Sequence, residues 1–564
     1  MIPRLTARGL LVLGSASLTI LVGALHAAPP LVGLGGLVLA ALSAAYIIFY
    51  PTAVLLRRKK IELSWWVPPG DQPGGALAAD RPFQLHIAFR NHGARTLRVL
   101  HTRVLSGSAL ATDEDVPATV GAGKQVEVLT TVRPQAAGYQ VLHGAALVLG
   151  DALGLFDVEA YFPNPIAVKV FPRQLPADSR AVRPTAGAPH EQVGLHRVRR
   201  RGLAGELREL REHSHGDPFK FIAWKATARR GKLMVRDLEN EIVATHMLVL
   251  DLGATMRGTP GRGPLDWAID AAAAMARAAL DGGDRVGLVS WDTRIYNELR
   301  PGSGHHHWLQ LVDRLLDVQC VVDEDLTDIT PGELVAAVAR YLAHQEAFDA
   351  RVRIAPPLDD ARWQSIQAGP DGQLYDLGAM NRTIAKLLTV MGGSERKGLA
   401  PAWWWSRVHL AADGDPQLAP LRLFCRLRGI EIAYRRDHEL SRRATGFARA
   451  VERAVSEGRP DSVVIISDLA GLLEDEATTL RALARARRAA GSVIAVTPTR
   501  WRFAPPARTS PGSRVREVMT AELREQLDAT RRLLARHGVR VIEAGPGDHP
   551  AGMFARTRGG RRVA

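Results

Sequence analysis

Residues 205–251, GELRELREHSHGDPFKFIAWKATARRGKLMVRDLENEIVATHMLVLD, decide how the rest of the chain is organised. A run of alternating charges comes first, followed by a turn at Gly216 and Asp217 and a Trp-Lys step. The stretch then continues into an apolar strand that ends on the carboxylate of Asp251. The residues before it are typical of an anchor and a spacer, and the residues after it are typical of an α/β domain.

Short apolar runs alternate with helical patterns from residue 245 onward. The predicted strands are 245–251, 285–291, 429–434, 462–468, 492–497 and 539–544, and the predicted helices are 265–280, 307–316, 446–456, 475–490 and 513–537. This alternation predicts a mostly parallel sheet wrapped by helices. Ligands of such sheets bind beyond the carboxyl ends of the strands, where Asp251 and Asp468 lie. Residues 317–420 break the alternation, and we interpret them as an insertion with one clear helix at 331–348.

Two apolar stretches near the N-terminus, 9–28 and 31–50, contain no Lys, Arg, Asp or Glu. Each is long enough to span a bilayer, so residues 1–60 are predicted to form a transmembrane hairpin. Basic residues precede the first stretch and follow the second, which predicts a multi-pass protein of the inner (cytoplasmic) membrane with its soluble domains in the cytoplasm. A cleaved signal peptide is the competing interpretation of the first stretch, although the second would still stop transfer.

Residues 61–175 have strand character. Residues 84–89 alternate polar and apolar side chains, and further short strands are predicted at 97–104, 125–132, 139–149 and 166–171. Strands of this spacing, separated by turn-forming residues, predict a small β-sandwich. Residues 176–204 begin with a stretch rich in Pro, Ala and Gly and are interpreted as a linker.

Length and composition leave several functions open. A chain of 564 residues predicts two to four compact units. The net charge of +15 is compatible with a nucleic-acid partner, with an anionic membrane surface, or with an Arg-rich composition that has no functional meaning. Two cysteines, Cys320 and Cys425, provide neither a disulfide framework nor a zinc site, which fits a reducing compartment.

The charged stretch at 205–245 contains a turn and a short helix. Asp217 is predicted to cap a helical turn that starts at Pro218. The helix would separate its apolar from its basic side chains. These are Phe221, Trp224 and Ala228 on one face, and Lys225, Arg229 and Arg230 on another. The charges form either salt bridges within the fold or a docking surface, and both interpretations stay open.

Residues 216–241, GDPFKFIAWKATARRGKLMVRDLENE, resemble the signature of domain-of-unknown-function family 58 (DUF58). The resemblance extends over most of the chain except the insertion. It departs from the family pattern at His213, Lys220 and Ala223. The signature positions, for which the resemblance implies partner binding, are Gly216, Asp217, Trp224, Lys225, Arg229 and Glu241.

The resemblance implies a von Willebrand factor A-like (Rossmann-like) domain at 246–564 behind the hairpin and the β-sandwich. Such domains often hold a divalent cation on an Asp-x-Ser-x-Ser element, a distant Thr and a later Asp. The matching residues here are Asp251, Thr255 and Asp468, while Gly253 replaces the middle Ser. The resemblance therefore implies a degenerate Mg²⁺ site, with waters completing the octahedral coordination that magnesium prefers.

The resemblance also implies a MoxR-type AAA+ ATPase as the partner. The chain has no phosphate-binding Gly-x-x-x-x-Gly-Lys-Ser/Thr loop of its own, so any ATP would be hydrolysed by the partner. We therefore expect a non-enzymatic, membrane-anchored scaffold or adaptor that serves the assembly or maturation of other proteins. One alternative is a metal-assisted hydrolase that uses Asp251 and Asp468. Another is a basic protein that binds nucleic acid or a membrane surface, with a steep salt dependence in the case of nucleic acid.

Overall fold

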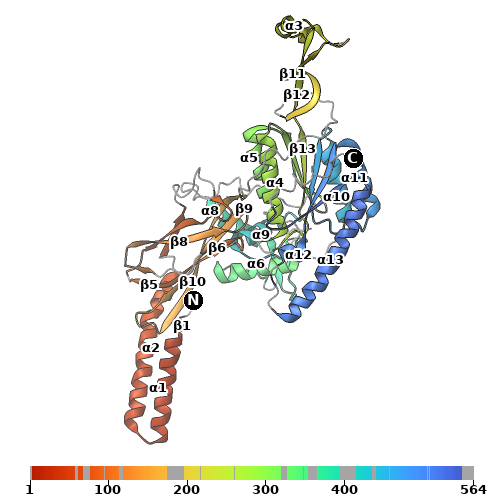
Figure 1. The fold of residues 1–564 in the computed structure, drawn as a ribbon. Helices are drawn as coiled ribbons and strands as arrows, with labels where there is room; N and C mark the ends of the chain where they lie inside the picture. Colours follow the sequence, from red (N-terminus) through yellow and green to blue (C-terminus); the bar gives the residue numbers. More distant parts are fainter. Residues whose placement is uncertain are drawn as a thin grey trace. The chain divides into compact units, whose positions relative to one another are not determined.

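The computed structural model describes residues 3–57, 61–67, 77–94, 96–112, 118–173, 196–215, 217–258, 261–318, 327–346, 348–352, 365–392, 415–434, 440–456, 458–504, 506 and 509–548. The chain divides into two compact units (Figure 1). The first unit comprises residues 1–170 and 322–433, and the second comprises residues 171–321 and 434–564.

Two apolar helices open the first unit, α1 at Ala7–Leu25 and α2 at Pro29–Arg57. Thr6 caps α1 by accepting a hydrogen bond from the backbone N–H of Gly9. Both helices are long and apolar enough to cross a membrane, and most of their surface is unburied within the chain. The two helices that the sequence predicted are thus confirmed, and they suggest that the protein associates with a membrane.

Two antiparallel sheets follow the helices in the first unit. One has the order β1-β10-β9-β5-β7 with β3 paired to β10, and the other has the order β2-β4-β8-β6. Their strands are β1 Arg4–Leu5, β2 Ile61–Trp66, β3 Leu77–Ala78, β4 Phe83–Asn91, β5 Leu97–Ser106, β6 Leu110–Thr112, β7 Ala118–Val120, β8 Gln125–Pro134, β9 Gly138–Gly150 and β10 Phe156–Phe171. Apolar residues of both sheets share one core, the arrangement of a β-sandwich.

From residue 327 onward, the described part of the predicted insertion belongs to the first unit rather than to the sheet of the second. It contains α6 Pro331–Gln345, β16 Ile366–Ala368, β17 Leu374–Asp376, α8 Leu377–Gly392 and α9 Ala419–Arg428. The predicted strand at 429–434 is wrong. Residues 421, 424, 425 and 427 are buried at helical spacing, and Gly429 ends α9 in the left-handed region at a φ of 69°.

A six-stranded sheet forms the centre of the second unit, with the order β15-β14-β13-β18-β19-β20. Its strands are β13 Thr245–Asp251, β14 Arg285–Trp291, β15 Ile295–Gly302, β18 Ser462–Ile466, β19 Ser492–Pro498 and β20 Arg540–Ala544. All pairs are parallel except β14 with β15. Numbered along the chain, the order is 3-2-1-4-5-6, that of a doubly wound α/β sheet. The predicted mostly parallel sheet is therefore confirmed.

Helices connect these strands. They are α4 Pro264–Asp281, α5 Gly304–Asp317, α10 Leu440–Ser456, α11 Glu476–Ala489, α12 Arg500–Phe503 and α13 Ser510–Arg536. Residues of α10, α11 and α13 share a buried core with β13, β18 and β19. Helix α10 begins six residues before its predicted start at Gly446, and this earlier start places Arg443 inside the helix.

A separate two-stranded antiparallel ribbon precedes the sheet in the second unit. It consists of β11 His196–Glu212 and β12 Met234–Ile242, so β11 includes the last residues of the predicted linker. The ribbon pairs Glu212 with Met234, and the residues between them form its tip. The tip contains a 3₁₀ turn at Phe219–Phe221 and helix α3 at Trp224–Arg230 (Figure 1).

Candidate functional site

The carboxyl edge of the sheet brings together Asp251 and Asp468 from neighbouring parallel strands. Asp251 is the last residue of β13, and Ser467 and Asp468 directly follow β18. Leu250 pairs with Ile466, so the two strands end at the same level. β13 and β18 are also the strands between which the sheet order reverses, the position at which doubly wound sheets bind their ligands.

Asp251 is fully buried, and its carboxylate accepts hydrogen bonds from three directions. The backbone N–H of Gly253 donates to Oδ1 at 2.8 Å, and the hydroxyl of Ser467 donates to Oδ2 at 2.5 Å. The third donor is the Nη2 group of Arg443, which also binds Oδ2. A buried carboxylate needs such partners, because leaving it unpaired away from water is costly.

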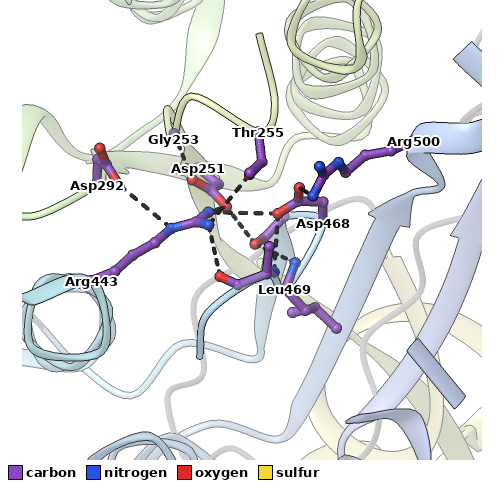
Figure 2. Close-up of polar contacts among 10 residues, drawn as sticks. Asp251, Gly253, Thr255, Asp292, Arg443, Asp468, Leu469 and Arg500 are labelled. Carbon is purple, nitrogen blue, oxygen red and sulfur yellow. Dashed lines mark hydrogen bonds and ion pairs between the residues drawn. The ribbon is translucent and has the colours of Figure 1, made fainter. Parts of the chain in front are cut away.

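Arg443 lies at the centre of the site with no exposed side-chain surface (Figure 2). Its Nη1 group donates to the carbonyl of Ala470 at 2.7 Å and to the hydroxyl of Thr255 at 3.3 Å. Its Nη2 group lies 3.6 Å from Oδ1 of Asp468, and its Nε lies 3.4 Å from Oδ1 of Asp292. One guanidinium therefore contacts three carboxylates. We call these four residues the Arg443 cluster: Arg443, Asp251, Asp292 and Asp468.

The pKa values of this cluster follow from burial and from charge. Burial raises the pKa of Asp251 to about 6, the charge of Arg443 opposes this shift, and the neighbouring carboxylates reinforce it. Burial by itself would lower the pKa of Arg443, but the charges of the three carboxylates prevail and raise it. The guanidinium is therefore permanently charged, and burial makes the charged form of Asp251 costly.

A cavity of about 390 Å³ adjoins the cluster on the side of Asp468. Its lining includes Asp468, Thr497, Arg500 and Trp501. Oδ2 of Asp468 and the hydroxyl of Thr497 are buried without a hydrogen-bond partner. Nη1 of Arg500 lies 3.8 Å from this oxygen, and Figure 2 shows this ion pair. A molecule entering the cavity would thus reach the cluster through Asp468 rather than through Asp251.

The three residues of the expected Mg²⁺ site do come together, but they surround the guanidinium of Arg443. Asp251, Thr255 and Asp468 all contact or approach it. A magnesium ion requires oxygen ligands at about 2.0–2.1 Å and cannot share this space with a second cation. Among the described residues, no group of three or more His, Cys, Asp or Glu side chains is placed to hold a metal ion. The arrangement therefore does not fit magnesium.

The residues of the charged signature lie elsewhere, on the ribbon and at its tip. Asp217 does not cap the 3₁₀ turn, whose N-cap is Pro218 without a side-chain bond. Its carboxylate instead accepts two hydrogen bonds from Arg211, one of them at 2.7 Å, and one from the backbone N–H of Ser214 at 2.8 Å. The Arg211 guanidinium holds the pKa of Asp217 well below its usual value.

Three signature side chains, Trp224, Lys225 and Arg229, project from the short helix α3 and are exposed. Glu241 belongs to β12, where its backbone pairs with Arg197. Gly216 lies outside the described residues. The structure thus separates the expected site residues into two groups, one at the carboxyl edge of the sheet and the other on the ribbon and its tip.

Arg443 is a site residue that the sequence patterns did not predict, although the sequence contains a signal for it. The buried apolar residues described in α10 include Ala444, Phe447, Ala450, Val451 and Ala454. Arg443 lies four residues before Phe447 and therefore on the apolar face of the helix. An arginine on such a face must be paired, and acidic residues at strand ends are the available partners.

Residues 209–341 match the family model described as "Protein of unknown function DUF58". This match supports the DUF58 family for the chain, on the same stretch that carries the signature. The curated proteins include no match.

Solved structures give only remote similarity. A FixG-related protein from Vibrio parahaemolyticus aligns at 10% identity and a TM-score of 0.13, covering 19% of this chain and 96% of that one. A GH20 exo-β-N-acetylglucosaminidase from Vibrio harveyi, in complex with N-acetylglucosamine, aligns at 10% identity and a TM-score of 0.14, covering 78% and 82%. TM-scores this low carry no argument about fold or function.

Proposed function

We propose that the protein is a membrane-anchored scaffold or adaptor that binds a partner protein through the tip of its β11–β12 ribbon. The exposed side chains of this tip carry the proposal. Phe219 is 76% exposed, Trp224 is 65% exposed and Leu233 is 45% exposed. Large apolar side chains exposed together in this way are typical of interaction sites, and Trp is prominent among the residues that dominate binding energies.

Charge defines the kind of partner. The exposed basic residues at the tip are Lys220, Lys225, Arg229, Arg230 and Lys232. Asp217 is already held by Arg211, and Glu212 pairs with Lys232 at 2.9 Å. The remaining positive charge favours an acidic partner face with an apolar pocket, because complementary charge steers association.

A MoxR-type AAA+ ATPase is the partner that the family resemblance implies, and we propose it here. The proposed biological role is the assembly or maturation of other proteins. The doubly wound sheet order supports a von Willebrand factor A-like domain as the body that carries the ribbon. The basic residues around the two apolar helices support a cytoplasmic location for that body.

Affinity capture with the full-length, detergent-solubilised protein tests this proposal. The test variant is Phe219→Ala/Trp224→Ala, and the matched control is Val515→Ala/Val518→Ala on α13, where both valines are also largely exposed. We expect the wild type and the control to capture an AAA+ ATPase. The tip variant should capture it at least tenfold less well, since each truncation costs more than about 1 kcal/mol at such a hot spot.

Equal capture by the tip variant and the wild type would overturn the proposal. Binding of the tip to vesicles containing an anionic lipid, without capture of any protein, would also overturn it and would favour the membrane-surface alternative. To distinguish these two outcomes, the protein is placed in nanodiscs of neutral lipid and its binding to added anionic vesicles is measured. Only the membrane-surface alternative predicts that the wild type binds the vesicles and the tip variant does not.

A further inference from the structure

The Arg443 cluster contains more negative than positive charge in a buried space. Asp251, Asp292 and Asp468 are each at most 4% exposed at the side chain, and Arg443 is fully buried among them. Arg500 adds a second cation at 3.8 Å from Asp468, but its side chain is 37% exposed and its charge is partly screened. Arg443 is therefore a fully buried cation that contacts all three carboxylates, and it binds Asp251 directly.

The hydrogen bonds of Arg443 resemble the ligand set of a hard metal ion. Its donors face two carboxylates, the hydroxyl of Thr255 and the carbonyl of Ala470. All of these groups present oxygen, the ligand type that Mg²⁺ and Mn²⁺ prefer. A guanidinium cannot lose its charge in a protein, so the position is filled by a cation at any physiological pH.

Gly253 supplies an independent observation. A Cβ atom built on this residue would lie 2.8 Å from Nη2 and 2.9 Å from Cζ of Arg443, closer than real Cβ atoms approach other atoms. Any side chain at position 253 would therefore displace the guanidinium. The position of the Arg443 guanidinium therefore depends on glycine at position 253.

We propose that Arg443 is the resident cation of this site, that it closes the cluster to divalent ions, and that it conceals a latent divalent-ion site which its removal would open. The oxygens left behind would be those of Asp251, Asp468, Thr255 and Ala470, with Asp292 nearby. This inference is independent of the partner proposed above, because the cluster and the ribbon tip share no residue.

Manganese binding to the full-length protein in detergent tests the proposal. The protein is stripped of metal with EDTA, the EDTA is removed, and free Mn²⁺ is measured by electron paramagnetic resonance during a titration with Mn²⁺. The variants are Arg443→Gln and Arg443→Gln/Asp251→Asn. The control is Arg277→Gln, which removes an arginine from an exposed ion pair with Asp281. We expect the wild type and the control to show only weak, non-stoichiometric Mn²⁺ binding. Arg443→Gln should bind one Mn²⁺ per chain, at least tenfold more tightly than this weak binding. The second substitution should abolish that site.

The same samples give a second readout in thermal unfolding. Millimolar Mn²⁺ should raise the Tm of Arg443→Gln and leave that of the wild type unchanged, because a ligand stabilises only a state that binds it. A wild type that binds one Mn²⁺ in an Asp251-dependent way would overturn the proposal. A folded Arg443→Gln variant that binds no Mn²⁺ would also overturn it.

The variant Arg443→Lys covers the case in which Arg443→Gln does not fold, since lysine keeps the positive charge. It should still exclude Mn²⁺, and stoichiometric binding by Arg443→Lys would count against a resident cation at this position.

Discussion

A Cβ atom on Gly253 would lie 2.8 Å from Nη2 of Arg443. This relationship predicts that Gly253→Ser destabilises the protein. The guanidinium is the end of a long side chain, but its bonds to Asp251 and Ala470 prevent it from moving away freely. Overpacking of this kind costs about 1–3 kcal/mol in the free energy of unfolding. Urea unfolding of the full-length protein measures the loss.

The control for this prediction is the same substitution in an Arg443→Ala background. Without the guanidinium, the serine has room, so Gly253→Ser should cost much less there than in the wild type. Such non-additivity is the mark of two residues in contact. Equal losses in the two backgrounds would show that Gly253 is constrained by something other than Arg443.

Asp217 and Arg211 give a pH dependence at the ribbon tip. Arg211 lowers the pKa of Asp217 from its ordinary value of 3.8. A carboxyl whose pKa is lower in the folded chain stabilises the fold above the unfolded value, and this stabilisation is lost as the pH falls through the folded value. We therefore expect the tip to loosen only below about pH 3.8, and Asp217→Asn to loosen it already at neutral pH.

Hydrogen exchange of the α3 and β12 amides, followed by mass spectrometry, measures this loosening. Asp528→Asn, at an exposed position on α13, is the matched control and should leave the tip unchanged. Protection of the tip that is identical in Asp217→Asn and the wild type would contradict the structural role of the Arg211–Asp217 pair.

His143 gives the first unit a pH dependence at a higher pH than that expected for Asp217. Its ring donates from Nδ1 to the carbonyl of Leu427 at 2.8 Å, and Gly429 approaches the ring closely. Burial lowers the pKa of His143 below 6.5, opposed by the bond to Leu427 and reinforced by the charges of Arg426 and Arg428. The unfolded chain therefore binds this proton more readily, so stability is lost as the pH falls through 6.5.

Exchange of the α9 amides at pH 7.5 and 5.5, corrected for intrinsic rates, checks this expectation. Protection should fall at the lower pH in the wild type and in His344→Gln, an exposed control on α6. His143→Gln should remove most of that difference, because glutamine does not titrate. A pH response that persists in His143→Gln would assign it to another group.

Most of the parallel strands of the second unit could be predicted from sequence because they carry buried apolar runs. β13 and β14 begin and end at the predicted residues. β15 was not predicted, since it pairs antiparallel at the edge and its sequence, IYNELRPG, has no apolar run. The strand predicted at 429–434 failed because the chain there closes the end of α9: the N–H of Ile430 donates back to the carbonyl of Cys425, and residues 429–433 form no strand.

Of the candidate site, the sequence predicted the carboxylates but not the arginine that pairs with them. Strand-end carboxylates are visible in a sequence, so Asp251 and Asp468 could be placed together. Their counter-ion comes from α10, 192 residues after Asp251 along the chain, and such a pairing leaves no local pattern. The location of the cluster was therefore predictable, whereas the identity of its cation depended on tertiary structure.

A double-mutant cycle between Asp251 and Arg443 tests most directly whether the guanidinium holds this edge of the sheet. Removing one partner of a buried pair costs about 3–5 kcal/mol because it leaves an unpaired buried charge. In EDTA, Arg443→Gln should therefore lose about that much unfolding free energy in urea. Adding Asp251→Asn should restore part of it, so that the double variant is more stable than Arg443→Gln alone. Losses that simply add would contradict the assignment of Arg443 as the counter-ion of Asp251.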